Sequence, residues 1–399
     1  MGQQGPKRRA NSLRRWRRLA RCRGRCGVRR LAATLTPPGM EVTVSNALQS
    51  TIEAAFRRQA QGDRDVKSAH LLVQSDRREV ELRVAEGATD EVPATVRQPL
   101  HLASVGKLFT ATVIGMLHEA GELSFDAPIT TYLDDELMRG LHVYRGKDLS
   151  HEIQVRHLLN QSSGLADCFW PLLKRMGDDP TLEFTPREAV LWGKEHLRPK
   201  ARPGQRHHYT DTNYHLLGLI VENVTGAPFH EALHGRIFSP LGMDSAFMQG
   251  YSRPAVTSDQ PVAGLFFDGV NYAGDARFAR IDYAGGGVTA ELDDYLKFMH
   301  ALAEHRLVAR ATLDRMLSDD HRSYPGMRYG YAVWKVVTVP LLMPAAYNCW
   351  GCSGVTGAFM FFHPGTGSYV IGTFGDTSYR SKALRFMFSK VLRPLVKGA

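Results

Sequence analysis

The spacing of apolar residues changes twice along the chain, and these changes limit the folds that it can adopt. Residues 70–74 and 80–84 have the pattern of short strands joined by a polar turn. Longer segments follow in which apolar residues recur three and four positions apart, as on one face of a helix. Strand-like runs then return at residues 329–338, 358–362 and 368–374. Strands at both ends with helices between them predict an α/β fold of the α+β kind. The two chain ends would build one antiparallel sheet, with helices packed on it and a helical insertion between.

The apolar spacing also sets the helix boundaries. The predicted helices cover residues 45–61, 108–120, 213–224, a segment capped by Thr289, and residues 378–395. The second of these is apolar on almost all sides and stops at Gly121, which is typical of a buried helix. Gly226 is expected to end the third helix in the same way. The last helix is expected to end at Pro394, because proline is unfavourable inside a helix.

Residues 1–40 differ from the rest of the chain in charge. They hold twelve Lys or Arg residues and no Asp or Glu. Their positive charge therefore exceeds the net charge of +10 of the whole chain. Residues 41–399 are therefore close to neutral. We predict that residues 1–40 form a basic, disordered extension. Two alternatives stay open: an arm that binds nucleic acid or anionic lipid, and upstream sequence translated from a misplaced start codon before Met40.

The composition excludes several classes of protein. With 43% hydrophobic residues the chain is globular rather than disordered. No stretch approaches the roughly 20 apolar residues of a membrane span, and none follows the basic start as in a secretory signal. We therefore expect no transmembrane segment and a cytoplasmic location. Five cysteines in a chain of 399 residues do not make a disulfide framework.

Ser104 and Lys107 form a Ser-x-x-Lys pattern at the opening of the predicted helix over residues 108–120. Three positions apart on a helix, both side chains lie on one face. The helix dipole favours an alkoxide on Ser104, and partial desolvation is expected to lower the pKa of Lys107 enough for a neutral amine base. On this motif alone, an N-cap serine with a solvent-facing lysine is the simpler interpretation.

A second pattern, Tyr209-Thr-Asp211, lies between a predicted turn at residues 202–205 and the predicted helix over residues 213–224. A tyrosine at such a junction can face a cleft and help to remove a proton if a nearby cation stabilises its phenolate. The alternative is a packing tyrosine whose hydroxyl group lies in water.

A third pattern is the glycine-rich segment at residues 350–357, just before the predicted strand over residues 358–362. Glycines beside a strand let a ligand approach closely and leave amide groups free to bind an anion. Cys349 and Cys352 also have the spacing of a redox dithiol, but such a motif should open a helix rather than lead into a strand. A zinc site would need a second pair of ligands, and no second cysteine pair exists outside residues 1–40, so no metal or other cofactor is expected.

Together and in this order, the three patterns resemble the serine β-lactamase and penicillin-binding-protein superfamily. The branch of class C β-lactamases, D-alanyl-D-alanine carboxypeptidases and esterases looks most similar. Further similar segments lie at residues 157–165, 209–218, 240–243 and 284–289. The resemblance implies a β-lactamase/transpeptidase-like fold: an antiparallel sheet flanked by helices, a helical subdomain, and an active site between them. It also implies one hydrolase domain over residues 41–399.

The resemblance also implies roles for individual residues. Ser104 would be the acyl-accepting nucleophile, Lys107 the partner that takes its proton, and Tyr209 a general base or proton shuttle. The oxyanion hole would be the backbone N–H groups of Ser104 and Val355. The expected reaction is acylation of Ser104 by a small ester, amide or peptide substrate, followed by transfer of the acyl group to water or another nucleophile. No nucleic acid is required for this reaction.

Two positions depart from the pattern of that superfamily. Many relatives have asparagine at the position of Asp211, and a carboxylate there could pair with Lys107 or raise its pKa. Relatives have histidine or lysine at the position of Cys352, a cation that helps to hold a substrate carboxylate. Ser353 and Gly354 of this substrate-binding motif remain. β-Lactam and D-peptide cleavage are therefore less expected than acyl transfer in general, and a catalytically idle, ligand-sensing protein of the same fold stays the alternative.

Overall fold

The computed structural model of the protein describes residues 41–339 and 344–398. The extension predicted for residues 1–40 lies outside the described residues. Within them, no helix combines the length and the apolar character that crossing a membrane requires.

One antiparallel sheet joins the two ends of the described chain. In spatial order its nine strands are β11 (His321–Tyr324), β12 (Met327–Tyr329), β13 (Trp334–Val336), β14 (Cys349–Gly354), β15 (Ala358–His363), β16 (Ser368–Thr373), β1 (Ser68–Ser75), β2 (Val80–Thr89) and β3 (Val92–Pro93). The early strand β1 pairs with the late strand β16, with Leu72 opposite Ile371. This pairing confirms the sheet predicted from the strand-like runs at both ends of the chain.

Alternate residues of these strands point into two different hydrophobic cores. Leu72 of β1 belongs to one core, whereas its neighbours Leu71 and Val73 belong to the other. This alternation is the ordinary consequence of the two-residue period of a strand. Both faces of the sheet are therefore covered by other elements.

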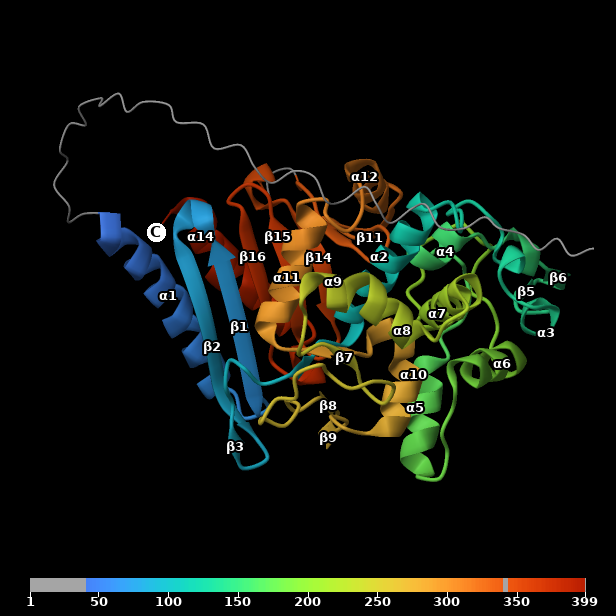
Figure 1. The fold of residues 1–399 in the computed structure, drawn as a ribbon, viewed down its shortest axis with the longest axis horizontal. Helices are drawn as coiled ribbons and strands as arrows, with labels where there is room; N and C mark the ends of the chain where they lie inside the picture. Colours follow the sequence, from blue (N-terminus) through green and yellow to red (C-terminus); the bar gives the residue numbers. More distant parts are fainter. Residues whose placement is uncertain (1–40, 340–343, 399) are drawn as a thin grey trace, which may run out of the picture. The chain divides into compact units, whose positions relative to one another are not determined.

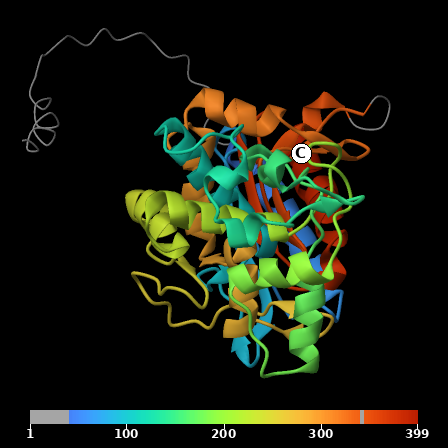
Figure 2. The same ribbon diagram turned by 90° about the vertical axis from the view of Figure 1, so that its right-hand side faces the viewer.

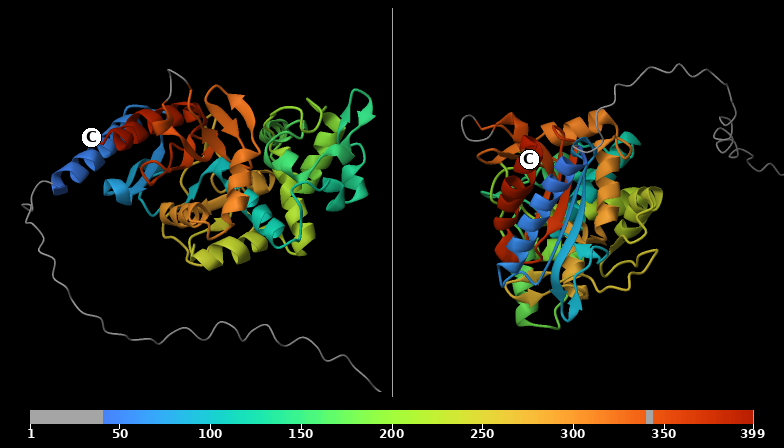
Figure 3. Two further views of the ribbon diagram at one scale, coloured as in Figure 1. Left: turned by 90° about the horizontal axis from the view of Figure 1, so that it is seen from above. Right: turned by 90° about the vertical axis from the view of Figure 1, so that its left-hand side faces the viewer.

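The first helix and the last helices cover one face of the sheet and contact each other (Figure 3). They are α1 (Glu41–Gln61), α13 (Lys382–Phe386), a π-helical turn (Met387–Leu392) and α14 (Arg393–Lys397). The prediction that the last helix ends at Pro394 is wrong. Pro394 lies in the first turn of α14, directly after the π-helical turn, where a missing N–H group costs little.

The chain between β3 and β11 supplies the other helices (Figures 1 and 2). They are α2 (Gly106–Glu119), α3 (Asp135–Met138), α4 (Val155–Leu159), α5 (Phe169–Asp178), α6 (Pro186–His196), α7 (Thr212–Thr225), α8 (Phe229–Leu233), α9 (Ser239–Leu241), α10 (Ala276–Gly286), α11 (Leu292–Ala303) and α12 (Arg310–Ser318). Small sheets lie among them: β4 (Leu100–His101) with β10 (Val288–Ala290) and β7 (Phe247–Met248), β5 (Val143–Tyr144) with β6 (Lys147–Asp148), and β8 (Phe266–Phe267) with β9 (Val270–Asn271). Helices α2 and α11 bury their apolar sides in the same core as Leu72.

Two local predictions are corrected by the structure. Thr289 does not cap a helix; it lies in strand β10, and Glu291 holds the N-cap position of α11. No strand is predicted for the glycine-rich segment, but its first half lies in strand β14. Gly351 makes this possible: a Cβ atom there would stand 2.1 Å from the carbonyl oxygen of Met360 on β15.

Candidate active site

Ser104 lies in a short 3₁₀ turn, Ala103–Val105, that leads into α2. The preceding Ala103 has a φ of +48°, a conformation that residues other than glycine rarely adopt. Its backbone N–H donates to Nδ1 of His101 at 3.1 Å, which holds the turn in place. At Gly106 the helix approaches Gly286 so closely that a Cβ atom would stand 2.8 Å from its backbone.

Lys107 is the second residue of α2 and is fully buried. Its Nζ donates to Oγ of Ser104 at 3.0 Å and to the carbonyl oxygen of Gly285 at 2.7 Å. The third neighbour is Oδ1 of Asp211 at 2.5 Å. An ammonium group has three N–H donors, so all three are used. The structure thus brings Ser104, Lys107 and Asp211 together, and a pair of Asp211 with Lys107 is one of the possibilities that the resemblance left open.

The charge state of Lys107 differs from the expectation based on burial alone. Burial lowers the pKa of Lys107, but the carboxylates of Asp211 and Asp282 and the phenol of Tyr209 act in the opposite direction. The net pKa lies well above the ordinary value. The expectation of a lowered pKa is therefore wrong, and the alternative, a lysine paired with Asp211, is the arrangement observed. Lys107 is an ammonium group at neutral pH.

Tyr209 precedes α7, whose N-cap residue is Asp211. The Tyr209 ring lies 5.3 Å from Nζ of Lys107 and stacks on Trp334 with 6.5 Å between ring centroids. Burial raises the pKa of Tyr209 above its ordinary range, although the Lys107 cation and a hydrogen bond with Ser104 oppose this shift. Tyr209 is thus a phenol at neutral pH, and it faces both residues of the Ser-x-x-Lys pattern.

Two carboxylates near Lys107 were not predicted from the sequence. Asp167 accepts the backbone N–H of Asp211 at 3.0 Å, and burial together with the Asp211 charge raises its pKa to about 7. Asp282 lies with Oδ2 at 3.0 Å from Nε2 of His101. The signal for Asp282 was its place directly before the glycine run at residues 284–289, which had been noted only for its resemblance.

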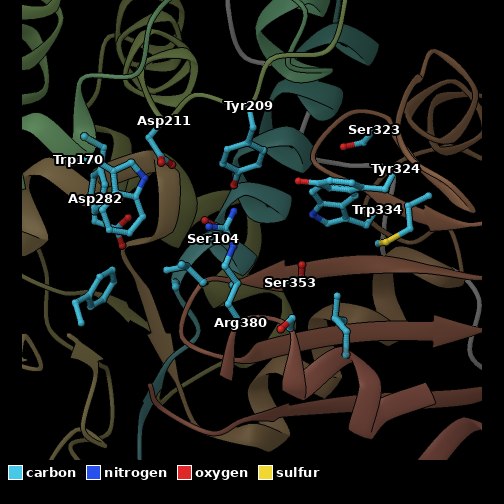
Figure 4. Close-up of a pocket in the computed structure, with 18 of the residues that line it drawn as sticks. Ser104, Trp170, Tyr209, Asp211, Asp282, Ser323, Tyr324, Trp334, Ser353 and Arg380 are labelled. Atoms are coloured by element: carbon cyan, nitrogen blue, oxygen red, sulfur yellow. The ribbon is translucent and has the colours of Figure 1, made fainter. Parts of the chain in front are cut away.

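A cavity of about 600 Å³ opens above Ser104. Figure 4 shows Trp170, Asp211 and Asp282 on one side of it and Tyr324 and Trp334 on the other. Aromatic side chains dominate its walls: Phe169, Trp170, Tyr209, Phe267, Phe278, Tyr324 and Trp334. Apart from Tyr209, no motif in the sequence marks these side chains, because they come from α5, β8, α10, β11 and β13.

The glycine-rich segment forms one wall of the same cavity through Ser353, Gly354 and Val355. Neither the backbone N–H of Ser104 nor that of Val355 has a hydrogen-bond acceptor within residues 41–339 and 344–398. Two unpaired amide donors beside a nucleophilic hydroxyl can receive the negative oxygen of a tetrahedral intermediate.

Cys352 does not line the cavity. Its buried thiol donates to the carbonyl oxygen of Ser104 at 3.2 Å, and burial raises its pKa to about 12. Cys349 belongs to the core on the opposite face of the sheet, because residues three apart in a strand point in opposite directions. The two thiols therefore do not form a dithiol.

Arg380 is a cation at the cavity that sequence analysis missed. It lies exposed in the segment before α13, and it lines both the cavity and an adjoining groove. No ion pair with an acidic side chain is found for it within the described part of the chain. It reaches the cavity from a C-terminal segment that carries no motif.

Comparisons with known proteins agree with this geometry. A family model described as Beta-lactamase matches residues 52–384. A D-aminopeptidase from Brucella anthropi is 31% identical over 227 residues, which cover 54% of this chain and 39% of that protein. The chain thus aligns with about two fifths of that relative's length.

Solved structures show the same fold. A D-stereospecific amidohydrolase from Streptomyces sp. superposes with a TM-score of 0.70 at 22% identity, covering 86% of this chain and 98% of that one. EstCE1, described as a hydrolase with promiscuous acyltransferase activity, gives a TM-score of 0.69 at 19% identity, covering 89% of this chain and 99% of that one. Because the family model spans most of the chain, the protein belongs to the Beta-lactamase family.

Proposed function

We propose that residues 41–399 form a serine hydrolase or acyltransferase that cleaves an ester or amide bond through an acyl-Ser104 intermediate. The observation that carries this proposal is the contact between Lys107 and the Ser104 hydroxyl, within a cavity whose wall also presents the unpaired N–H of Val355.

In the proposed reaction, Oγ of Ser104 attacks the substrate carbonyl carbon and loses its proton to Tyr209 or Lys107. The negative oxygen of the tetrahedral intermediate accepts hydrogen bonds from the N–H groups of Ser104 and Val355. The bond to the leaving group breaks, and the leaving group takes the proton. Water or another nucleophile then attacks the acyl-Ser104 carbonyl, and the same groups return the proton to Oγ.

The protonation states of the two candidate bases give this reaction a distinctive pH dependence. At neutral pH Lys107 is an ammonium group and Tyr209 is a phenol. One of them must lose a proton before it can accept the one from Ser104. The rate of acylation should therefore rise as the pH rises above neutral.

The substrate class is supported by the names of similar proteins. They include a D-aminopeptidase, a D-stereospecific amidohydrolase and a hydrolase with promiscuous acyltransferase activity. We therefore propose a small amide or ester substrate. Cys352 supplies no charge to the cavity, so Arg380 is the cation that we propose for any carboxylate on the substrate.

A fluorophosphonate probe tests the nucleophile. The wild-type protein should be labelled covalently at Ser104, and Ser104→Ala should not be labelled. Ser323→Ala is the matched control, because Ser323 is another serine that lines the same cavity and has no assigned role. Equal labelling of the wild type and Ser104→Ala would refute the assignment.

A second candidate function is an idle, ligand-sensing protein, and one observation favours it. Asp211 holds Lys107 in its protonated form, which does not accept a proton. A panel of short-chain aryl esters separates the two functions. Turnover that is lost in Ser104→Ala excludes the sensor, whereas binding of ligands without any turnover up to alkaline pH excludes the enzyme.

A further inference from the structure

We propose that Asp282 and the aromatic wall beside it bind a protonated amino group of the substrate. The substrate class would then be amides, esters or short peptides that carry a free ammonium group close to the bond that is cleaved. This inference rests on the proposed function, since it concerns the same cavity, but its test does not require turnover.

The first observation concerns the two oxygens of the Asp282 carboxylate. The side chain is only 8% exposed, and Oδ2 faces Nε2 of His101 at 3.0 Å. Oδ2 and Nε2 of His101 are both buried without a hydrogen-bond partner, and no hydrogen-bond donor to the other oxygen, Oδ1, is found among the described residues either. Asp282 nevertheless lines the cavity above Ser104. A buried carboxylate that accepts no hydrogen bond within the described part of the chain, and that lines a cavity, can accept one from a ligand.

The second observation is the balance of charge around Lys107. Three polar atoms lie within 4 Å of the point where a Cβ atom on Gly285 would stand: Oδ1 of Asp211, Nζ of Lys107 and Oδ1 of Asp282. Lys107 is paired with Asp211 and does not contact Asp282. Two carboxylates thus share one ammonium group, which leaves a negative charge that a second cation would neutralise.

His101 does not supply that cation. Its Nδ1 accepts the backbone N–H of Ala103, so that nitrogen carries no proton. The ring is then neutral, and its Nε2 lies 3.0 Å from Oδ2 of Asp282 without a hydrogen bond between them. Arg380 also lines the cavity, but no ion pair between it and Asp282 is found in residues 41–339 and 344–398.

The third observation is the aromatic surface next to this carboxylate. Phe278 packs against His101 with ring centroids 5.9 Å apart and against Phe169 at 6.0 Å. Trp170 contacts Phe169 at 5.3 Å and is 43% exposed. Phe169, Trp170 and Phe278 all line the cavity. Aromatic faces attract an ammonium group, and a buried carboxylate adds a charge-assisted hydrogen bond.

The proposed ammonium site at Asp282 lies close to Ser104, where the substrate carbonyl would react. Nζ of Lys107 contacts Ser104 and lies in the same group of three atoms as Asp282. An ammonium group at Asp282 would therefore stand a few bonds from a carbonyl held at Ser104. This spacing suits the α-amino group of an aminoacyl substrate.

The test is a binding experiment in the Ser104→Ala background, so that no substrate is consumed. Phenylalaninamide, which has a free amino group, is compared with N-acetylphenylalaninamide by isothermal titration calorimetry at neutral pH, in both the D and L forms. We expect the free amine of at least one form to bind roughly tenfold or more tightly than its acetylated partner. Adding Asp282→Asn should reduce that ratio to about one.

The matched control is Asp293→Asn, which removes one negative charge from an exposed position on α11 outside the cavity. It should leave the binding ratio unchanged. Equal binding of the amine and the acetamide, or a preference that survives Asp282→Asn, would refute the ammonium site. The proposed function is tested separately: if the fluorophosphonate did not label Ser104 in the wild-type protein, that function would be refuted, whatever the binding ratio.

Discussion

Nζ of Lys107 lies 2.5 Å from Oδ1 of Asp211 and donates to Ser104 at 3.0 Å from the same buried position. The lysine beside the nucleophile is therefore held as a cation by a carboxylate. A charge placed this way stabilises an alkoxide on Ser104, but it must be discharged before Lys107 can act as a base.

Replacing Asp211 by asparagine should lower the pKa of Lys107, because the carboxylate that favours the ammonium form is removed. The rising limb of the pH profile of kcat/KM for an aryl ester should then move to lower pH, so that the variant gains relative activity near neutral pH. Stopped-flow measurements of acylation across the neutral and alkaline range would show the shift. Asp293→Asn is the control, and an identical profile in Asp211→Asn would rule out Lys107 as the titrating group.

Replacing Asp167 by asparagine should change how stability depends on pH. The pKa of Asp167 is about 7 in the folded protein, above the value of about 4 for an unfolded aspartate, so the folded state binds the extra proton between these values. Asp167 therefore costs stability progressively as the pH rises from about 4 to 7. Asp167→Asn keeps an Oδ1 acceptor for the N–H of Asp211 but carries no ionisable group. At pH 8 its free energy of unfolding should therefore exceed that of the wild type by roughly 1–4 kcal/mol.

Urea denaturation at acidic and mildly alkaline pH would measure this difference between the wild type and Asp167→Asn. The exposed Asp314 provides the control, since Asp314→Asn removes a carboxylate on α12, outside the site. The same pH dependence in the wild type and Asp167→Asn would show that Asp167 is ionised throughout.

Replacing Tyr209 by phenylalanine should lower kcat/KM for an aryl ester by roughly 10²–10⁴, because a proton-transfer group is removed while the ring that packs on Trp334 stays. The effect should appear in kcat more than in KM. Tyr324→Phe is the matched control, since Tyr324 is a second, exposed tyrosine of the same cavity. Similar losses in both variants would remove the special role of Tyr209.

Replacing Cys352 by serine should leave the rate with a neutral aryl ester within a few-fold of the wild type. Its thiol is un-ionised at neutral pH, with a pKa of about 12, and it only donates to the Ser104 carbonyl oxygen, which a hydroxyl can also do. Esterase assays and mass spectrometry of the acyl-enzyme would check this. If Cys352→Ser abolished turnover and Ser104→Ala did not, the nucleophile would be the cysteine.

The elements that the sequence predicted best are those with a strong apolar period. The buried helix α2 and the helix α7, ended by Gly226 in a left-handed conformation, follow directly from such patterns. Strand β14 was missed because its glycines are typical of a turn; only the close approach of β15 at Gly351 explains them. Ser104, Lys107 and Tyr209 were named from motifs that resemble a known superfamily; Lys107 lies in the first turn of α2, and Ser104 and Tyr209 lie just before α2 and α7.

The remaining site residues could not be found in this way. Asp282 faces the cavity because α10 is kinked at Tyr283, where φ is +40° and ψ is −124°. Its partner His101 comes from a two-residue strand, and Arg380 from a segment near the C-terminus. Their positions depend on contacts between distant parts of the chain, which no local pattern encodes.

The pairing of β1 with β16 also determines how late in translation the active site can be completed. Ser104 leaves the ribosome early, but the N–H of Val355 that faces the same cavity belongs to the turn between β14 and β15. The strand that joins these late strands to β1 comes later still. A nascent chain therefore carries its reactive serine for most of translation without the groups that would let it react, and the two are united only when the final strands dock.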